Sequence, residues 1–136
     1  MVFFEWDNKL CTNIPIIDEQ HKKLISFVNE LHEAMRNKKG KEVVGKILNE
    51  LKEYTIYHFG TEEKAFDKYN YPKKAEHKKY HADLIRQVKE LQDNYEKGKI
   101  AISIDVFNFL TNWVKNHIMK EDMEYVPLLK DKTIEQ

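Results

Sequence analysis

Apolar residues recur at helical spacing in the segment that follows residue 17. Their positions are Leu24, Ile25, Val28, Leu31 and Met35. This i, i+3, i+4, i+7 spacing is typical of an amphipathic α-helix and predicts a helix over about residues 18–38. Asp18 is the expected N-cap residue, and Gly40 is expected to end the helix after a run of basic and polar residues.

Three further apolar stripes predict helices over about residues 41–66, 72–97 and 103–121. The sequence Tyr69-Asn70-Tyr71-Pro72 separates the second helix from the third, because proline is tolerated in the first turn of a helix but not in its middle. Residues 1–17 lack helical periodicity and are expected to form an extended arm. Residues 122–136, which contain Pro127, are expected to form a short helical turn or coil.

Four helices of comparable length joined by short loops predict an all-α, up-down-up-down four-helix bundle with an extended N-terminal arm. The length of 136 residues is that of a single domain. Only 4 glycines and 3 prolines are present, whereas all-β folds use both residues freely in turns. We therefore expect one helical domain over residues 1–136.

The charge balance argues against two classes of partner. Lys plus Arg and Asp plus Glu each number 23, so no net charge attracts the chain to nucleic acid or to an anionic membrane. No apolar run approaches the roughly 20 residues that span a bilayer, and the N-terminus does not resemble a signal peptide. The single cysteine, Cys11, cannot form an internal disulfide and suits a reducing compartment. A cytoplasmic protein is expected.

Histidine placement points to a metal centre. The six histidines are His21, His32, His58, His77, His81 and His117. All but His32, which we expect at the surface, lie on the predicted inward faces. One histidine on an apolar stripe is more often a hydrogen-bonded core residue than a ligand. Five buried imidazoles and two carboxylates without partners, however, would cost several kcal/mol each, in a domain with only about 5–15 kcal/mol of net stability.

The expected ligand set suits a pair of iron ions. Five imidazoles and two carboxylates are too many for one tetrahedral zinc, the absence of thiolates disfavours iron–sulfur sites, and calcium and magnesium prefer oxygen ligands. Glu62 lies four residues after His58. Asp122 lies five residues after His117 and reaches the same face only if the helix bends, widens or ends. The spacing leaves Glu121, four residues after His117, as an alternative.

The ordered motifs resemble those of the hemerythrin family, and specifically the bacterial hemerythrins. The matching motifs are His21, His58-x3-Glu62, His77-x3-His81 and His117-x4-Asp122. The flanking sequences Ile17-Asp18-Glu19-Gln20-His21 and Trp113-Val114-x2-His117-Ile118 match as well, and the resemblance covers residues 3–130.

This resemblance implies a non-haem di-iron centre. One iron would bind His77, His81 and His117, and the other His21 and His58. Glu62 and Asp122, rather than Glu121, would bridge the ions together with an oxo or hydroxo group. The iron with two histidines would keep an open position, where dioxygen would add oxidatively and reversibly as a hydroperoxide. The pocket wall is expected to contain Leu24, Phe59, Trp113, Val114 and Ile118.

The resemblance implies an oxygen carrier, store, delivery protein or sensor, and not an enzyme. Dioxygen is the expected partner, an oxygen-consuming client would be a further one, and the oligomeric state is open with a monomer favoured. The alternatives are an iron store or a di-iron enzyme, namely an oxidase, a peroxidase or a nitric-oxide-handling protein. Ferritin-like di-iron sites use Glu-x-x-His pairs, whereas this chain has His-x-x-x-Glu. A regulatory role would require a separate output partner.

Overall fold

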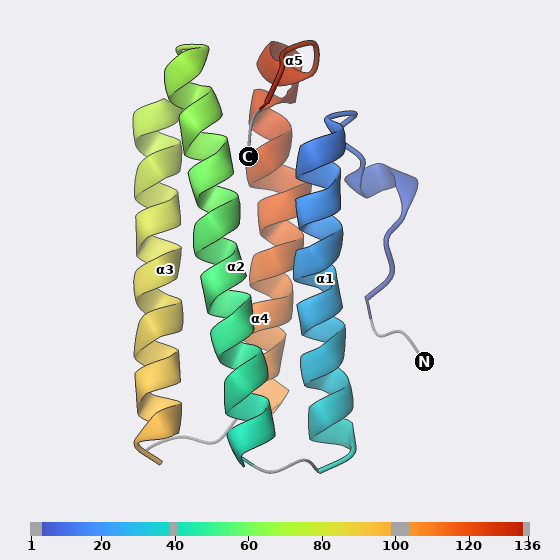
Figure 1. The fold of residues 1–136 in the computed structure, drawn as a ribbon, viewed down its shortest axis with the longest axis vertical. Helices are drawn as coiled ribbons and strands as arrows, with labels where there is room; N and C mark the ends of the chain where they lie inside the picture. The colour runs from blue at the N-terminus through green and yellow to red at the C-terminus, as the bar shows by residue number, and fades with distance from the viewer. Residues whose placement is uncertain (1–3, 39–40, 99–103, 135–136) are drawn as a thin grey trace.

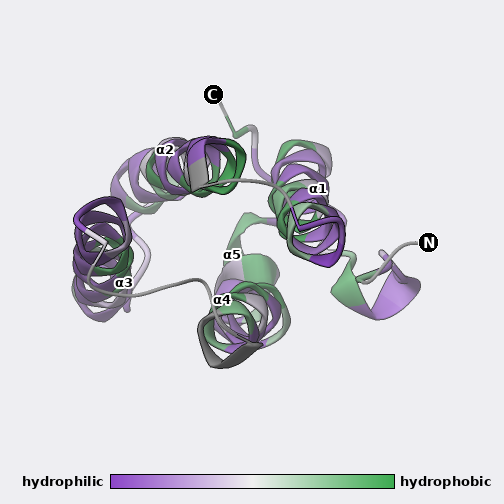
Figure 2. Cartoon of the chain, turned by 90° about the horizontal axis from the view of Figure 1, so that it is seen from below, coloured by the Kyte–Doolittle hydropathy of each residue, from purple (hydrophilic) through white to green (hydrophobic). Residues whose placement is uncertain are grey.

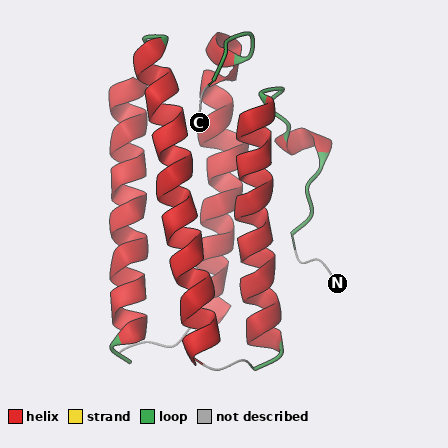
Figure 3. Cartoon of the chain, viewed as in Figure 1, coloured by secondary structure: helices red, strands yellow, loops and turns green. Residues whose placement is uncertain are grey.

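Long helices lie side by side and alternate in direction along the chain (Figure 1). The computed structural model describes residues 4–38, 41–98 and 104–134. Its long helices are α1 (Pro15–Arg36), α2 (Lys41–Lys68), α3 (Lys74–Glu96) and α4 (Ile104–Asn116). Figure 3 shows helices and loops but no strand among the described residues. The predicted all-α four-helix bundle is confirmed.

The fourth helix changes type instead of continuing to residue 121 as predicted. The α-helical part α4 is followed by a π-helical segment, η2 (His117–Glu121), and then by a 3-10 segment, η3 (Asp122–Tyr125). A short helix, α5 (Val126–Leu129), completes the run. Pro127 lies in the first turn of α5, where a missing backbone N–H leaves no helical hydrogen bond unmade.

The start of α1 differs from the sequence prediction. The helix begins at Pro15 with Ile14 as N-cap, and no side chain caps it. Proline suits this position because its φ angle is preset and its absent N–H has no partner in a first turn. Asp18 therefore lies inside the helix, and its buried carboxylate accepts hydrogen bonds from the backbone N and the Oγ1 of Thr12, both at 2.8 Å. Asp18 thus ties the arm to α1.

The arm is not fully extended, because Asn8–Leu10 forms a 3-10 turn, η1. The Asp7 carboxylate accepts a hydrogen bond from the backbone N–H of Lys9 at 2.7 Å. Farther along, the Cys11 thiol donates to Asp18 Oδ2 at 3.3 Å. The arm is therefore held by local polar contacts.

Left-handed residues mark the loops between helices. Lys38, with φ of 53°, turns the chain after α1, whereas Gly40, which was expected to end this helix, lies outside the described residues. Asn70, with φ of 56°, turns the chain between α2 and α3, so the predicted break at this position is confirmed. Gly98 follows α3 with φ of 75°, a conformation that glycine adopts without steric cost.

The apolar core among the described residues is divided into a larger and a smaller cluster, and the buried polar residues lie between them along the helices. In α1, His21 falls between Ile17 of the smaller cluster and Leu24 of the larger one. In α2, Glu62 falls between Phe59 and Ala65 in the same way. Figure 2 looks along the bundle and shows α1, α2, α3 and α4 around a shared interior. The fold therefore places a polar layer inside an otherwise apolar core.

Among the described residues, no helix has both the length and the apolar character needed to cross a lipid bilayer.

Candidate metal centre

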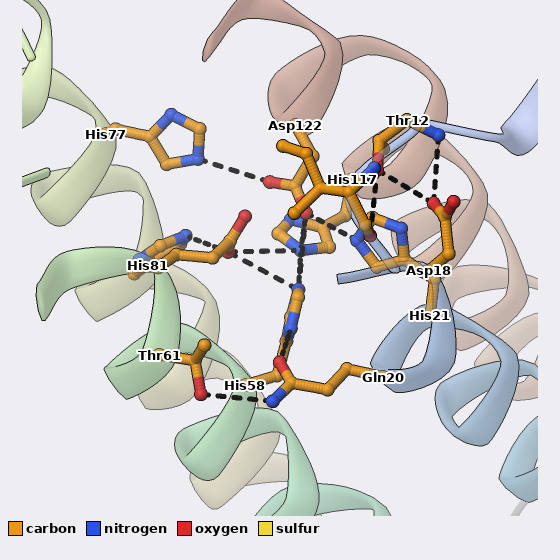
Figure 4. Close-up of polar contacts among 12 residues, drawn as sticks. Thr12, Asp18, Gln20, His21, His58, Thr61, His77, His81, His117 and Asp122 are labelled. Atoms are coloured by element: carbon orange, nitrogen blue, oxygen red, sulfur yellow. Dashed lines mark hydrogen bonds and ion pairs between the residues drawn. The ribbon is translucent and has the colours of Figure 1, made fainter. Parts of the chain in front are cut away.

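The structure brings all seven predicted ligand residues into this buried polar layer, and Figure 4 shows the five histidines and Asp122 among them. α1 supplies one of them, α2 two and α3 two, while η2 and η3 each begin with one. None of the seven is more than 4% exposed. They are His21, His58, Glu62, His77, His81, His117 and Asp122.

The ligand atoms form two overlapping groups. Within each group, all of the ligand atoms lie within 4.8 Å of one another. The first consists of His21, His58, Glu62, His117 and Asp122, and the second of Glu62, His77, His81 and Asp122. The two carboxylates common to both groups are the residues predicted to bridge two ions. One feature differs from the predicted division of ligands: His117 groups with His21 and His58, and its Nε2 lies 2.9 Å from Nε2 of His58.

The π-helical segment explains how Asp122 reaches the layer. In an α-helix, residues five apart lie about 140° apart around the axis, whereas a π-helical turn bonds residue i to residue i+5. The backbone N–H of Asp122 donates to the carbonyl oxygen of His117, which closes such a turn. The two side chains then meet, with 2.9 Å between His117 Nε2 and Asp122 Oδ2. Glu121 is half-buried and belongs to neither group.

Asp122 is the most connected carboxylate of the layer. Its Oδ2 lies 2.6 Å from His21 Nε2 and 3.2 Å from His58 Nε2, and its Oδ1 lies 3.4 Å from His77 Nε2. Burial by itself would raise the pKa of Asp122. The neighbouring His117, His21 and His58 outweigh this effect and hold the pKa well below its ordinary value. Asp122 is therefore ionised, as a metal ligand must be.

Several buried polar atoms of the layer make no hydrogen bond. They include both carboxylate oxygens of Glu62, Oδ1 of Asp122, and Nε2 of His77 and of His81. Buried polar atoms are nearly always satisfied in folded proteins, and imidazole nitrogens and carboxylate oxygens are ligands of first-row transition metals. The donor set therefore fits metal cations.

Two ligand histidines are oriented by side chains that the sequence analysis did not identify. His58 Nδ1 lies 2.7 Å from Oε1 of Gln20, whose Nε2 donates to Thr61 Oγ1 at 3.1 Å. His81 Nδ1 lies 3.0 Å from Oε2 of Glu63. Ligating histidines typically donate their second ring N–H in this way. Gln20 and Glu63 adjoin predicted ligands in sequence, but only the packing of helices reveals which ring each one contacts.

The five predicted pocket residues are all buried in the larger apolar cluster. Phe59 stacks on the His81 ring with 3.7 Å between centroids and 7° between planes. The Trp113 ring is nearly parallel to the His117 ring, with 5.8 Å between centroids and 12° between planes. These two aromatic rings therefore flank the histidines, and the other three residues, which are Leu24, Val114 and Ile118, are fully buried.

Tyr125 is a further residue that sequence reasoning missed. Its ring packs 5.4 Å from Phe66 and 5.9 Å from His77. Burial, and then the charges of Asp122 and Glu62, raise the pKa of Tyr125 well above its ordinary value. The phenol is therefore protonated beside the two shared carboxylates. The sequence signal that could have identified Tyr125 was its position three residues after Asp122.

His32 lies outside both ligand groups, as expected. It is nevertheless half-buried and not at the surface, because its ring packs against that of Phe107 with 5.5 Å between centroids.

Comparison with known proteins decides the family. A family model described as the hemerythrin HHE cation binding domain matches residues 12–129. The chain belongs to the hemerythrin family. Hemerythrins are, in general, non-haem di-iron proteins that bind oxygen, so the predicted non-enzymatic class agrees with the family.

The similarity to individual relatives extends over most of this chain. It is 32% identical to a bacteriohemerythrin of Pseudomonas aeruginosa over 130 residues, or 96% of this chain and 84% of the relative. It is 35% identical to a bacteriohemerythrin of Methylococcus capsulatus, over 87% of this chain and 89% of the relative. A crystal structure of wild-type hemerythrin superimposes with a TM-score of 0.87 at 32% identity, covering 94% of this chain and 98% of that one.

The titration of His81 leads to a prediction for the metal-free protein. Burial lowers the pKa of His81, but the nearby carboxylates of Glu62 and Glu63, at 3.2 and 3.0 Å, outweigh it and raise the pKa to about 9. Because the folded pKa exceeds the ordinary value of 6.5, the resulting stabilisation is fully present below pH 6.5 and is lost as the pH rises through about 9. It is on the order of 3 kcal/mol.

Denaturant unfolding of the metal-free protein between pH 6 and pH 10 measures this loss. A metal ligand must be a neutral imidazole, so metal binding should also release a proton below pH 9 and become tighter as the pH rises. A free energy of unfolding that is unchanged across this range would contradict the assignment.

Proposed function

We propose that this chain binds dioxygen reversibly at a non-haem di-iron centre. The observation that carries the proposal is the pair of buried ligand groups joined by Glu62 and Asp122. The proposed ligands are the seven residues of the polar layer. Storage, delivery or sensing of oxygen would each use this same reversible binding.

The proposed division of ligands follows the family resemblance. His77, His81 and His117 would hold one iron, His21 and His58 would hold the other, and Glu62 and Asp122 would bridge them together with an oxo or hydroxo group. The separate grouping of His77 and His81 supports this division. His117 Nε2 also lies 3.6 Å from Oε1 of Glu62, a member of both groups.

The chain's own residues suit reversible binding. When bound, the two ions would supply electrons and a vacant coordination position for the oxidative addition of dioxygen. Neutral imidazoles favour a reversible ferrous–ferric couple over the higher oxidation states that carboxylate-rich sites support. Phe59 and Trp113 cover two of the ligand rings, and such apolar walls exclude water and slow the loss of bound oxygen as peroxide.

Spectroscopy of the iron-loaded protein tests this proposal. The reduced protein should gain a visible absorption band in air, lose it under vacuum and regain it over repeated cycles, with about two irons per chain. Cys11→Ser is a matched control, since Cys11 lies outside both ligand groups, and it should cycle in the same way. Bleaching to the ferric state within one cycle would contradict reversible binding, and steady turnover of a substrate would indicate a di-iron enzyme.

A further inference from the structure

Two ligand histidines carry chemically different partners on their outer nitrogens. His58, of the first ligand group, faces the neutral amide of Gln20 at 2.7 Å. His81, of the second group, faces the carboxylate of Glu63 at 3.0 Å. The two candidate metal positions therefore differ by one negative charge placed directly behind a ligand ring.

The amide of Gln20 has a defined orientation. Thr61 Oγ1 donates to the backbone carbonyl of Tyr57 at 3.3 Å, so it accepts the hydrogen bond from Gln20 Nε2. The carbonyl end of Gln20 must then accept from His58 Nδ1–H. Gln20, Thr61 and His58 are all at most 2% exposed. The His58 ring is thus locked by a neutral network with its Nε2 directed at the shared carboxylates.

The Glu63 contact is of a different kind. An ionised carboxylate accepts a charge-assisted hydrogen bond, which is stronger than a neutral one. It draws the ring proton of His81 toward itself and makes the opposite nitrogen a better electron donor. Phe59 covers one face of the His81 ring, which shields that face from water, although Glu63 itself is 33% exposed. A partly exposed carboxylate can be changed without disrupting the core.

We propose, on the basis of the di-iron function above, that Glu63 and Gln20 are positioning residues that make the two metal positions electronically unequal. The ion beside His77 and His81 is the more electron-rich of the two and the more easily held in the oxidised state. The ion beside His58 is the more easily reduced.

Titration with Co2+ tests the inequality without dioxygen. Wild-type protein should bind two Co2+ with distinct affinities, and Glu63→Gln should weaken one of them by about tenfold, the lower end of the range for partners of metal ligands. Gln20→Glu should strengthen the other. The double variant that exchanges the two residues should invert the order. Glu50→Gln is the matched control, because this half-buried α2 residue lies outside both ligand groups and forms an ion pair with Lys46 at 4.0 Å.

A redox titration of the iron-loaded protein provides the second measurement. A tenfold fall in the ratio of ferric to ferrous affinity raises a one-electron potential by about 59 mV, and we expect this shift for Glu63→Gln and none for Glu50→Gln. Identical Co2+ affinities and potentials in these two variants would overturn the inference. Unequal Co2+ sites in a protein that fails to bind dioxygen would support the inference and refute the proposed function. Uptake of fewer than two Co2+ by the wild type would overturn both.

Discussion

Replacing His77 by alanine should reduce bound iron from about two per chain to about one or fewer and abolish the oxygenated absorption band. His77 Nε2 is buried, makes no hydrogen bond and faces Oδ1 of Asp122 at 3.4 Å. Because bound metal stabilises only the folded state, the variant should also lose the stabilisation that iron confers. That amounts to about 4 kcal/mol when free iron exceeds its dissociation constant a thousandfold.

The control for this experiment is His32→Ala, which removes the histidine that lies outside both ligand groups. It should keep both irons and the absorption band, although it loses the packing against Phe107. Iron content is measured by elemental analysis, and stability by denaturant unfolding with and without iron. Retention of two irons and a normal band by His77→Ala would remove His77 from the ligand set.

Phe59→Ala should weaken both the fold and the oxygenated form. Phe59 is 1% exposed, and truncating a buried phenylalanine typically costs about 3–5 kcal/mol of unfolding free energy. The same change uncovers a face of the His81 ring and leaves a cavity beside the polar layer. Water in that space should shorten the lifetime of the oxygenated form by about tenfold, an effect comparable to that of other changes around metal ligands.

Phe27→Ala separates these two effects. Phe27 is also buried, and its ring packs against Tyr54 at 5.8 Å, outside both ligand groups. It should therefore lose a comparable amount of stability and leave the decay of the visible band unchanged. Equal decay rates in the two variants would show that Phe59 acts on stability alone.

Helix boundaries show where local sequence was sufficient and where it was not. The break at Tyr69-Asn70-Tyr71-Pro72 was predictable because proline is tolerated in the first turn of a helix but not in its middle. The start of α1 was not predictable in this way. Asp18 is a residue type that often caps helices, but here it lies inside the helix, where its carboxylate accepts hydrogen bonds from Thr12. A polar side chain near a helix end can cap that helix or bind a neighbouring segment, and only the fold of the arm decides between them.

The chain by itself determined the four amphipathic stripes and the chemical identity of the inward histidines, because helical periodicity is a local property of about two turns. The tertiary structure decided what depends on distances between helices. It placed the amide of Gln20 behind His58 and the carboxylate of Glu63 behind His81. It also brought Asp122 onto the face of His117 through a π-helical turn, a departure from α-helical geometry that the five-residue spacing allowed but did not require.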